Sequence, residues 1–482
     1  MKVIIVGAGF TGTQLVQHLV QEGCDVSLIE SNEEKARHAS NRLDCLVLHD
    51  EGNSLESLEE AGISGADALI CVTDSDEVNM IICGLAASLF PNLLKIARVR
   101  NTDYKFYDRK VLGIDHFIHP DVEAARAVLM ALSHGASGNI LSFPGTPYEL
   151  ASVNIKERSA FDGLSLVNFH SVVKEESLIP LVERGQGCFL PTGSTSLHPG
   201  DLIHIITRKE NMAQIFSLAG RTETSLRRIG IVGGGRLGTL IAEGLMDRQG
   251  VSANSNKQKD GVASFFKFLG PKNGRQVTII EQNYSVCKDL AARFPEALVL
   301  NEDISDESFI AEEKIGGLDL IITATANQEL NIIAAVYLKS RGVKRAIALV
   351  SGSGYKTIAL QLGVDVAISL NSVVVDSILS HLRGGSIRDI HSLGDGSVDI
   401  IEVEIGEDSP AVEKAITELK LSSGGLVLLV HRGETSFIPH GDYIFRSADK
   451  VILIAKSGSE GEIDQFFGSP KNRNFWRPGK KI

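Results

Sequence analysis

The stretch "VIIVGAGFTGTQLVQHL", residues 3–19, runs from an apolar β-branched segment through a glycine-rich turn into an amphipathic segment. Its glycines Gly7, Gly9 and Gly12 have the GxGxxG spacing of a strand–turn–helix unit that binds dinucleotides. In such a unit the first glycine permits the tight turn and the second lets backbone N–H groups approach a pyrophosphate. The third lets the helix pack on the strand, and the positive end of the helix dipole faces the phosphates. The stretch therefore predicts a nucleotide site at the first turn of an α/β sheet.

The same pattern returns in the second half of the chain as "IVGGGRLGTLIAEGL", residues 231–245. Further segments repeat in the same order: "VSLIE", which ends at Glu30, matches "VTIIE", which ends at Glu281, and "LVERGQGCFLPTG" matches "LVHRGETSFIPHG". We therefore interpret the chain as a tandem duplication. The second copy carries an insert, residues 250–274, between its first helix and second strand; its polar first half indicates a mobile loop.

In each copy, apolar β-branched segments alternate with helical segments, a pattern that predicts a doubly wound parallel sheet. The segment that follows has short strands and Pro-Gly turns, which favours a small α+β domain. The predicted fold class is therefore α/β, a tandem duplication of a Rossmann-like sheet with a small α+β domain after each copy. The expected domains are Rossmann-like residues 1–135, small residues 136–220, Rossmann-like residues 226–384, small residues 385–457 and a basic tail at 458–482, with a link between the halves at 207–228.

Each Rossmann-like segment is expected to end in a long amphipathic helix. The first begins near Pro120, because acidic residues fill its first turn and apolar residues recur along one face. That face contains Val122, Ala125, Leu129 and Leu132, and its counterpart, with Asn371 as a cap, contains Val375, Ile378, Leu379 and Leu382. We interpret these apolar stripes as packing surfaces or a dimer seam, and not as ligand sites.

Composition excludes several classes of function. The formal net charge of −12 over 482 residues argues against a general nucleic-acid binder, which would present a basic surface. No segment approaches the roughly 20 unbroken apolar residues of a membrane span, and the glycines near the start argue against a signal peptide. The six cysteines form no CxxC pair, so we expect reduced thiols in a cytoplasmic protein and no metal site.

Glu30 ends the second predicted strand, where an acid accepts both ribose hydroxyls of an adenosine and repels a 2′-phosphate. NAD(H), ATP or ADP is therefore favoured over NADP as the ligand, the alternative being a Rossmann fold that has lost its ligand. The residues of the first turn expected to contact the ligand are Gly7, Ala8, Gly9, Phe10, Thr11 and Gly12.

Other candidate residues lie at the ends of the third and fourth predicted strands. Asp50 would stand near the adenine edge or cap a helix, and Thr73 and Asp74 would face the ligand. Glu77 and Asn79 recur in the second copy, which suits either a helix cap or an interface.

Arg98 and Arg100 lie in the fifth predicted strand, and charged side chains there need partners. We expect the two to point to opposite faces, so that one neutralises a phosphate and the other pairs with an acid or a neighbouring subunit. The second copy has Leu349 and Ser351 at these positions, which should weaken its binding of a ligand with several phosphates. The candidate residues that it retains are Gly233, Gly235, Arg236, Gly238 and Glu281.

No catalytic constellation is evident. A dehydrogenase needs a proton-transferring side chain opposite the nicotinamide, and His119 is better interpreted as a strand-end residue than as a base. The chain contains no GxxxxGK[ST] motif, which argues against a P-loop ATPase. An NAD-dependent oxidoreductase and a scaffold with empty Rossmann folds remain as alternatives.

The two alternations of "VIIVGAGFTG", "LIE", "TDSDEVN" and "ARVR" with a small domain resemble the regulator-of-potassium-conductance (RCK, or KTN) family. The single-chain duplication is similar to the cytoplasmic regulatory subunits of bacterial Trk potassium uptake systems. The resemblance implies a homo-oligomeric gating ring, a dimer or a dimer of dimers, that is not an enzyme. It also implies peripheral attachment to the inner face of the cell membrane through a TrkH-type channel subunit, and a response to NAD(H) or ATP/ADP.

Matching positions carry the family's first site onto Gly7, Gly9, Gly12, Glu30, Thr73, Asp74, Arg98 and Arg100, and its second site onto Gly233, Gly235, Gly238 and Glu281. The chain departs from the family pattern in the insert at 250–274, in the missing strand-five arginines of the second copy, and in the tail "SPKNRNFWRPGKKI".

Overall fold

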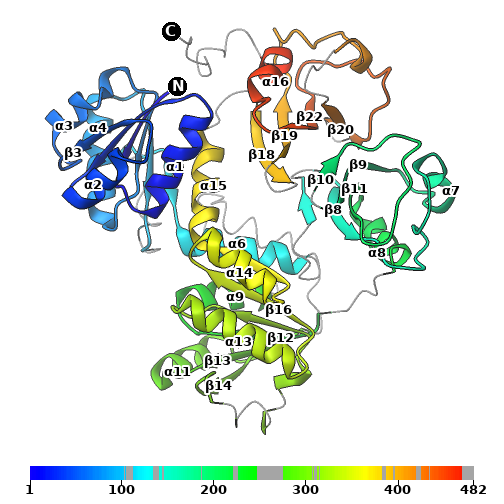
Figure 1. Ribbon diagram of the computed structural model, residues 1–482. Coiled ribbons are helices and arrows are strands. Elements are labelled where there is room, and N and C mark those ends of the chain that lie inside the picture. Colours follow the sequence, from blue (N-terminus) through cyan, green and yellow to red (C-terminus); the bar gives the residue numbers. More distant parts are fainter. Residues whose placement is uncertain are drawn as a thin grey trace.

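The computed structural model describes residues 1–101, 104, 112–133, 140–143, 146–185, 187–220, 226–246, 275–306, 308, 312, 313, 315–382, 387–393, 397–419, 425–433 and 435–468. Within these residues, each half of the chain forms a six-stranded parallel sheet followed by a five-stranded antiparallel sheet (Figure 1). The predicted α/β fold class and the tandem duplication are confirmed. The insert at 250–274 and residues 469–482 of the predicted tail lie outside the described residues.

The first parallel sheet has the strand order β3-β2-β1-β4-β5-β6, so the order reverses between β1 and β4. Its strands are β1 (Lys2–Val6), β2 (Asp25–Glu30), β3 (Leu46–His49), β4 (Ala68–Cys71), β5 (Leu94–Arg98) and β6 (His116–Ile118). The described helices that belong to this Rossmann-like segment are α1 (Phe10–Gln21), α2 (Glu33–Ser40), α3 (Leu55–Glu60), α4 (Asp76–Leu89) and α6 (Pro120–Ser133). In such sheets, ligands bind beyond the carboxyl ends of the strands at the point of reversal.

The second parallel sheet repeats the order as β14-β13-β12-β15-β16-β17. Its strands are β12 (Arg228–Val232), β13 (Gln276–Glu281), β14 (Leu298–Asn301), β15 (Leu320–Thr323), β16 (Arg345–Val350) and β17 (Val366–Ser369). Its helices are α9 (Arg236–Met246), α11 (Tyr284–Arg293), α13 (Gln328–Ser340), α14 (Ser353–Gln361) and α15 (Leu370–Leu382). The central strands of both sheets are buried on both faces, which is why they appear in the sequence as unbroken apolar segments.

The long helices that end the two Rossmann-like segments are exchanged between the halves. Val128 and Leu129 of α6 pack in the core of the second sheet, against α9, whereas Ile378 and Leu379 of α15 pack in the core of the first sheet, against α1. Figure 1 shows α15 lying beside α1, and α6 lying beside α9. The apolar stripes are therefore packing surfaces that join the two halves of one chain.

The two antiparallel sheets pack against each other through a shared apolar seam. Their strands are β7 (Ile140–Ser142), β8 (Tyr148–Asn154), β9 (Ser177–Arg184), β10 (Gly187–Phe189) and β11 (Leu202–Arg208) in the first, and β18 (Ile387–Leu393), β19 (Val398–Glu404), β20 (Leu426–Arg432), β21 (Thr435–Phe437) and β22 (Lys450–Lys456) in the second. Leu150 and Ile206 of the first sheet meet Ile400 and Ile452 of the second within one buried cluster. The halves are therefore joined at two places, by the exchanged helices and by this seam.

Two short helices were missed. The predicted link at 207–228 contains α8 (Met212–Leu218), in which Ile215 is buried in the first small domain. The predicted basic tail at 458–482 starts too early, because α16 (Glu460–Phe467) places Ile463 in the core of the second small domain. Among the described helices, none has both the length and the apolar character that crossing a membrane requires.

The sequence predicts Asn371 as the cap of α15, but the structure shows a different residue in that role. The helix begins at Leu370, and the hydroxyl of Ser369 accepts a hydrogen bond from the backbone N–H of Ser372 at 3.2 Å. Ser369 therefore acts as the cap, and the side chain of Asn371 is available for another role.

Candidate functional site

The first glycine turn has the close contacts that its sequence predicts. Gly7 adopts a φ of +107°, a conformation that favours glycine. A Cβ atom on Gly12 would lie 1.9 Å from the carbonyl oxygen of Gly7, so the start of α1 approaches the turn as closely as only glycine allows. A Cβ atom on Gly9 would meet nothing within 4 Å, because Gly9 faces open space. The turn therefore holds α1 against β1 and leaves its backbone accessible at Gly9.

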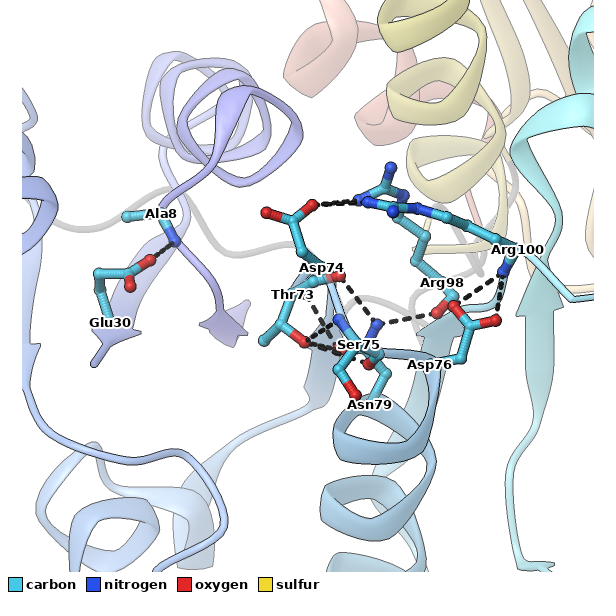
Figure 2. Close-up of polar contacts among 9 residues, drawn as sticks. All are labelled: Ala8, Glu30, Thr73, Asp74, Ser75, Asp76, Asn79, Arg98 and Arg100. Atoms are coloured by element: carbon cyan, nitrogen blue, oxygen red, sulfur yellow. Dashed lines mark hydrogen bonds and ion pairs between the residues drawn. The ribbon is translucent and has the colours of Figure 1, made fainter. Parts of the chain in front are cut away.

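Glu30 joins the glycine turn to the end of β2. Its carboxylate accepts a hydrogen bond from the backbone N–H of Ala8 at 2.6 Å and another from that of Asn32 at 2.9 Å, and Figure 2 shows the first of these. A carboxylate offers about four acceptor positions, so two remain for hydroxyl donors. Glu30 is therefore held in place beside the turn, with acceptor capacity to spare for the ribose hydroxyls that the sequence predicts.

A cleft of about 1100 Å³ opens between the turn and the ends of the central strands. Its lining includes the predicted residues Gly7, Ala8, Gly9, Phe10, Thr11, Glu30, Asp50, Thr73, Asp74 and Arg98. Lys35 and Arg42 add positive charge from α2 and the residues just after it, and Asn371 reaches the cleft from the first turn of α15. The cleft is thus completed by a residue of the other half of the chain.

The end of β4 is fixed by Asn79, which is fully buried in α4. Its side-chain oxygen accepts hydrogen bonds from the backbone N–H and the hydroxyl of Thr73, and its amide group donates to the carbonyl oxygens of Thr73 and Arg98. The side chain of Ser75, and not Asn79, caps α4. Asn79 therefore holds the ends of β4 and β5 together at the rim of the cleft.

Arg98 and Arg100 converge on one carboxylate, as Figure 2 shows. Arg100 donates to Asp74 at 2.6 Å, and Nη1 of Arg98 lies 3.6 Å from the same oxygen. The expectation that they point to opposite faces was wrong, because residues two apart in an extended chain share a face. Burial, and then the neighbouring Arg100, lower the pKa of Arg98, and its buried Nε has no hydrogen-bond partner among the described residues. Arg98 lines the cleft, so a phosphate there would find a poorly compensated cation.

Asp50 is oriented by hydrogen bonds at the edge of the cleft. Its carboxylate accepts from the hydroxyl of Ser57 at 2.5 Å and from the backbone N–H of Glu51 at 2.7 Å. These bonds, the one from Ser57 first, lower the pKa of Asp50. The cap of α3 is Ser54, so Asp50 lines the cleft without capping the helix.

The fourth residue of each glycine turn contacts the opposite half. Arg236 donates to the carbonyl oxygen of Arg100 at 2.6 Å, and its Nη1 lies 3.6 Å from a carboxylate oxygen of Asp121. Burial raises the pKa of Asp121, and the positive charge of Arg236 opposes that effect. Reciprocally, a Cβ atom on Gly352 would lie 3.6 Å from the ring of Phe10. Each turn therefore touches the strand-five end of the other sheet.

A second, smaller cleft of about 320 Å³ lies at the second glycine turn. The backbone geometry of the first glycine turn is repeated here. Gly233 has a φ of +101°, and a Cβ atom on Gly238 would lie 1.9 Å from the carbonyl oxygen of Gly233. Glu281 accepts hydrogen bonds from the backbone N–H groups of Gly234 at 2.7 Å and Asn283 at 2.8 Å. Gly233, Gly235 and Glu281 line this cleft, whereas the side chain of Arg236 is bonded to the first half.

Most, but not all, of the site residues predicted for the first copy line the first cleft. Arg100 lies behind Asp74 outside the lining of the first cleft. Lys35, Arg42 and Asn371 were missed, although the basic residues after Glu30 carried a signal in the sequence. His119, the only histidine considered as a base, bonds through Nδ1 to the carbonyl oxygen of Val99 at 2.8 Å. In the part of the chain that the structure describes, no group of acidic, His and Cys side chains is arranged to hold a metal ion.

The arrangement of the first cleft suits binding more than bond making. Open backbone at Gly9, the guanidinium of Arg98 and the carboxylate of Glu30 all line the first cleft. Amide groups and cations recognise phosphates, and carboxylates recognise hydroxyls.

Comparison with known proteins gives family matches in both halves of the chain and relatives that cover nearly all of it. Residues 3–120 and 266–370 match the TrkA-N domain, and residues 400–468 match the TrkA-C domain. The chain is 29% identical over 462 residues to the Trk system potassium uptake protein TrkA of Halomonas elongata, covering 94% of this chain and 95% of that protein. It is 28% identical over 474 residues to the protein of the same name from Azorhizobium caulinodans, covering 97% and 98%.

Solved structures share the fold. The GsuK RCK domain superposes with a TM-score of 0.55 at 18% identity, covering 96% of this chain and 94% of that one. The GsuK channel bound to NAD gives a TM-score of 0.55 at 17% identity, covering 97% of this chain and 78% of that one. At these identities the likeness concerns the arrangement of the backbone.

Proposed function

This chain belongs to the TrkA family of TrkA-N and TrkA-C domain proteins, and from that membership we propose that it is a nucleotide-binding regulatory subunit of potassium transport. One observation carries the proposal: the first cleft combines an accessible glycine turn, an oriented Glu30 and the cation of Arg98. Relatives named as potassium uptake proteins, and a structural neighbour bound to NAD, support it.

We further propose that the ligand of the first cleft is NAD(H) or ATP/ADP, and that the chain acts as a homo-oligomer on a TrkH-type membrane channel subunit. Glu30 favours an unmodified ribose, since a 2′-phosphate would meet its negative charge. In this proposal the protein attaches to the membrane through the channel. It performs no catalytic step: the ligand only shifts the balance between two geometries of the assembly.

The cluster of Asp74, Arg98 and Arg100 is the proposed sensor of the phosphates. A phosphate group that binds Arg98 competes with Asp74, and the backbone of Arg100 is already bonded to Arg236 of the other half. Movement at this cluster is therefore transmitted to the contact between the halves. A ligand shifts the equilibrium only through different affinities for the two geometries, so ligands that differ by one phosphate can have opposite effects.

Titration calorimetry of the purified full-length protein tests the function. We expect NADH, NAD⁺, ATP or ADP to bind, and the Glu30→Gln variant to weaken binding about 10- to 100-fold, because hydrogen bonds to a charged group are lost. Glu34→Gln, an exposed acid on α2, serves as the control and should bind as wild type does. Absence of heat and of thermal shift with every nucleotide would instead favour a scaffold without ligand. A substrate-dependent change in nicotinamide absorbance would favour an oxidoreductase.

Replacing both Arg98 and Arg100 with alanine should erase the difference between the affinities for ATP and ADP. The physical reason is that these guanidinium groups supply the positive charge next to Asp74 where an additional phosphate would lie. The measurement is a pair of titrations on the double variant, with the exposed Arg37→Ala as control. Discrimination equal to that of the wild type would show that another group senses the terminal phosphate.

A further inference from the structure

The second cleft retains the glycine-turn backbone of the first cleft, but the charges in its lining differ. Its lining includes three acidic residues, Glu281, Glu302 and Asp303, and no Lys, Arg or His among the described residues that surround it. The first cleft, by contrast, has Lys35, Arg42 and Arg98 in its lining. The lining of the first cleft also contains the carboxylates of Glu30, Asp50, Glu51 and Asp74, so the difference is that, among the described residues, only the first cleft offers cations to a phosphate.

At the positions of the second copy that correspond to the three cations of the first cleft, the residue is either apolar or a cation that forms an ion pair outside the cleft. The position of Arg98 is taken by Leu349, which is buried in the core, and that of Lys35 by Val286. Arg293 stands at the position of Arg42, but it pairs with Glu243 of α9 and does not line the cleft. At all three positions, therefore, no described cation enters this cleft to offset its carboxylates.

The one cation of the second glycine turn is also committed. Arg236 bonds to the carbonyl oxygen of Arg100 and lies beside Asp121, both in the first half. The hydroxyl of Ser351, at the position of Arg100, donates to the side-chain oxygen of Gln328. A diphosphate in this cleft would therefore meet three carboxylates and no cation among the described lining residues, and like charges repel.

The size and the acceptors of the cleft suit a smaller, uncharged molecule. Its volume of about 320 Å³ lies at the lower end of the range of ligand pockets, whereas the first cleft exceeds 1000 Å³. Glu281 uses its two oxygens to hold Gly234 and Asn283 and keeps acceptor capacity for hydroxyl donors. Glu302 and Asp303 add acceptors for hydroxyl or amino groups.

We propose that the second cleft binds an uncharged nucleoside, of the size of adenosine, and rejects nucleoside di- and triphosphates. The inference rests on the proposed function, because it takes the phosphate-binding first cleft as its reference. The chain then carries two non-equivalent sites: the first binds nucleotides through their phosphates, and the second binds the nucleoside alone.

Calorimetric titration of the full-length protein with ADP and with adenosine tests this. We expect one ADP per chain, and adenosine binding that persists when ADP is saturating. Glu281→Gln should weaken adenosine binding about 10- to 100-fold and leave ADP binding unchanged, while Glu30→Gln should do the reverse. Each glutamine keeps an oxygen acceptor for only one of the two backbone N–H groups that the carboxylate holds, so the melting temperature of each variant is measured alongside to verify folding.

A variant designed to gain ADP binding in the second cleft provides a second test of the inference. Asp303 is exposed and Glu302 is half-buried, and both replacements keep the size of the side chain, so the double variant Glu302→Gln with Asp303→Asn should remain folded and lose two of the three repelling charges. We expect it to bind a second ADP per chain. Two ADP per wild-type chain, or adenosine that is fully displaced by ADP, would overturn the inference and leave the proposed function intact. Failure of NADH, NAD⁺, ATP and ADP all to bind would refute the proposed function itself.

Discussion

Replacing Gly12 with alanine is expected to abolish nucleotide binding by the first cleft and to destabilise the protein. The added Cβ atom would lie 1.9 Å from the carbonyl oxygen of Gly7, a contact with backbone that no side-chain rotation relieves. Overpacking of this kind costs about 1–3 kcal/mol, and any shift of α1 moves the amide groups that would face the ligand. Calorimetry measures the lost affinity, and urea unfolding measures the lost stability.

Gly9→Ala separates the two effects. Gly9 has a φ of −67°, which alanine adopts without strain, and its Cβ atom would meet nothing within 4 Å. We expect wild-type stability with reduced affinity, because the methyl group enters the space through which a pyrophosphate approaches. A Gly12→Ala protein that binds nucleotide as tightly as the wild type would contradict this view of the turn.

Replacing Ile378 with alanine is expected to destabilise the first sheet, although Ile378 follows the second sheet in the chain. The side chain is fully buried in α15 within the core that includes β1 and β4. Truncation of such a residue typically costs about 2–5 kcal/mol. Hydrogen exchange should therefore accelerate in β1 and β4, and it should change less in β12 and β15.

Leu129→Ala in α6 is the reciprocal variant, because Leu129 is fully buried in the core of the second sheet. In this variant, amide hydrogen exchange should accelerate in β12 and β15. Ser377→Ala, on a partly exposed face of α15, controls for changes in the helix itself. If each variant loosened only the sheet that precedes it in the chain, the exchange of helices would be refuted.

Local patterns were sufficient to predict most of the fold. The conformations of Gly7 and Gly233 and the buried segments around them depend on neighbours close in the sequence, so their spacing is informative. Glu30 was predictable for the same reason, since it ends the strand next to the turn.

The exchange of α6 and α15 was not predictable. An apolar stripe such as that around Leu129 shows that a helix needs an apolar partner, but both sheets offer similar apolar faces. For the same reason Asn371 could not be assigned to the first cleft, which lies near the other end of the chain. The short helices around Ile215 and Ile463 were missed because seven or eight residues provide too few turns for a periodic signal.

The convergence of Arg98 and Arg100 was missed for a geometric reason. Residues two apart in an extended chain share a face, and Asp74 beyond β4 provides the carboxylate on which both side chains meet. The charges were correctly expected to need partners, and their common face follows from strand geometry; only their meeting at Asp74 required the structure.

The exchanged helices also impose an order on synthesis. The strands of the first sheet have all been synthesised once Ile118 is added, but the helix that covers one face of that sheet ends only at Leu382. Until then the nascent chain exposes an apolar surface of the kind that aggregates or recruits chaperones. Translation that stops between the halves therefore yields a product that lacks α15, and division of the gene at the midpoint separates each sheet from the helix that covers it in the undivided chain.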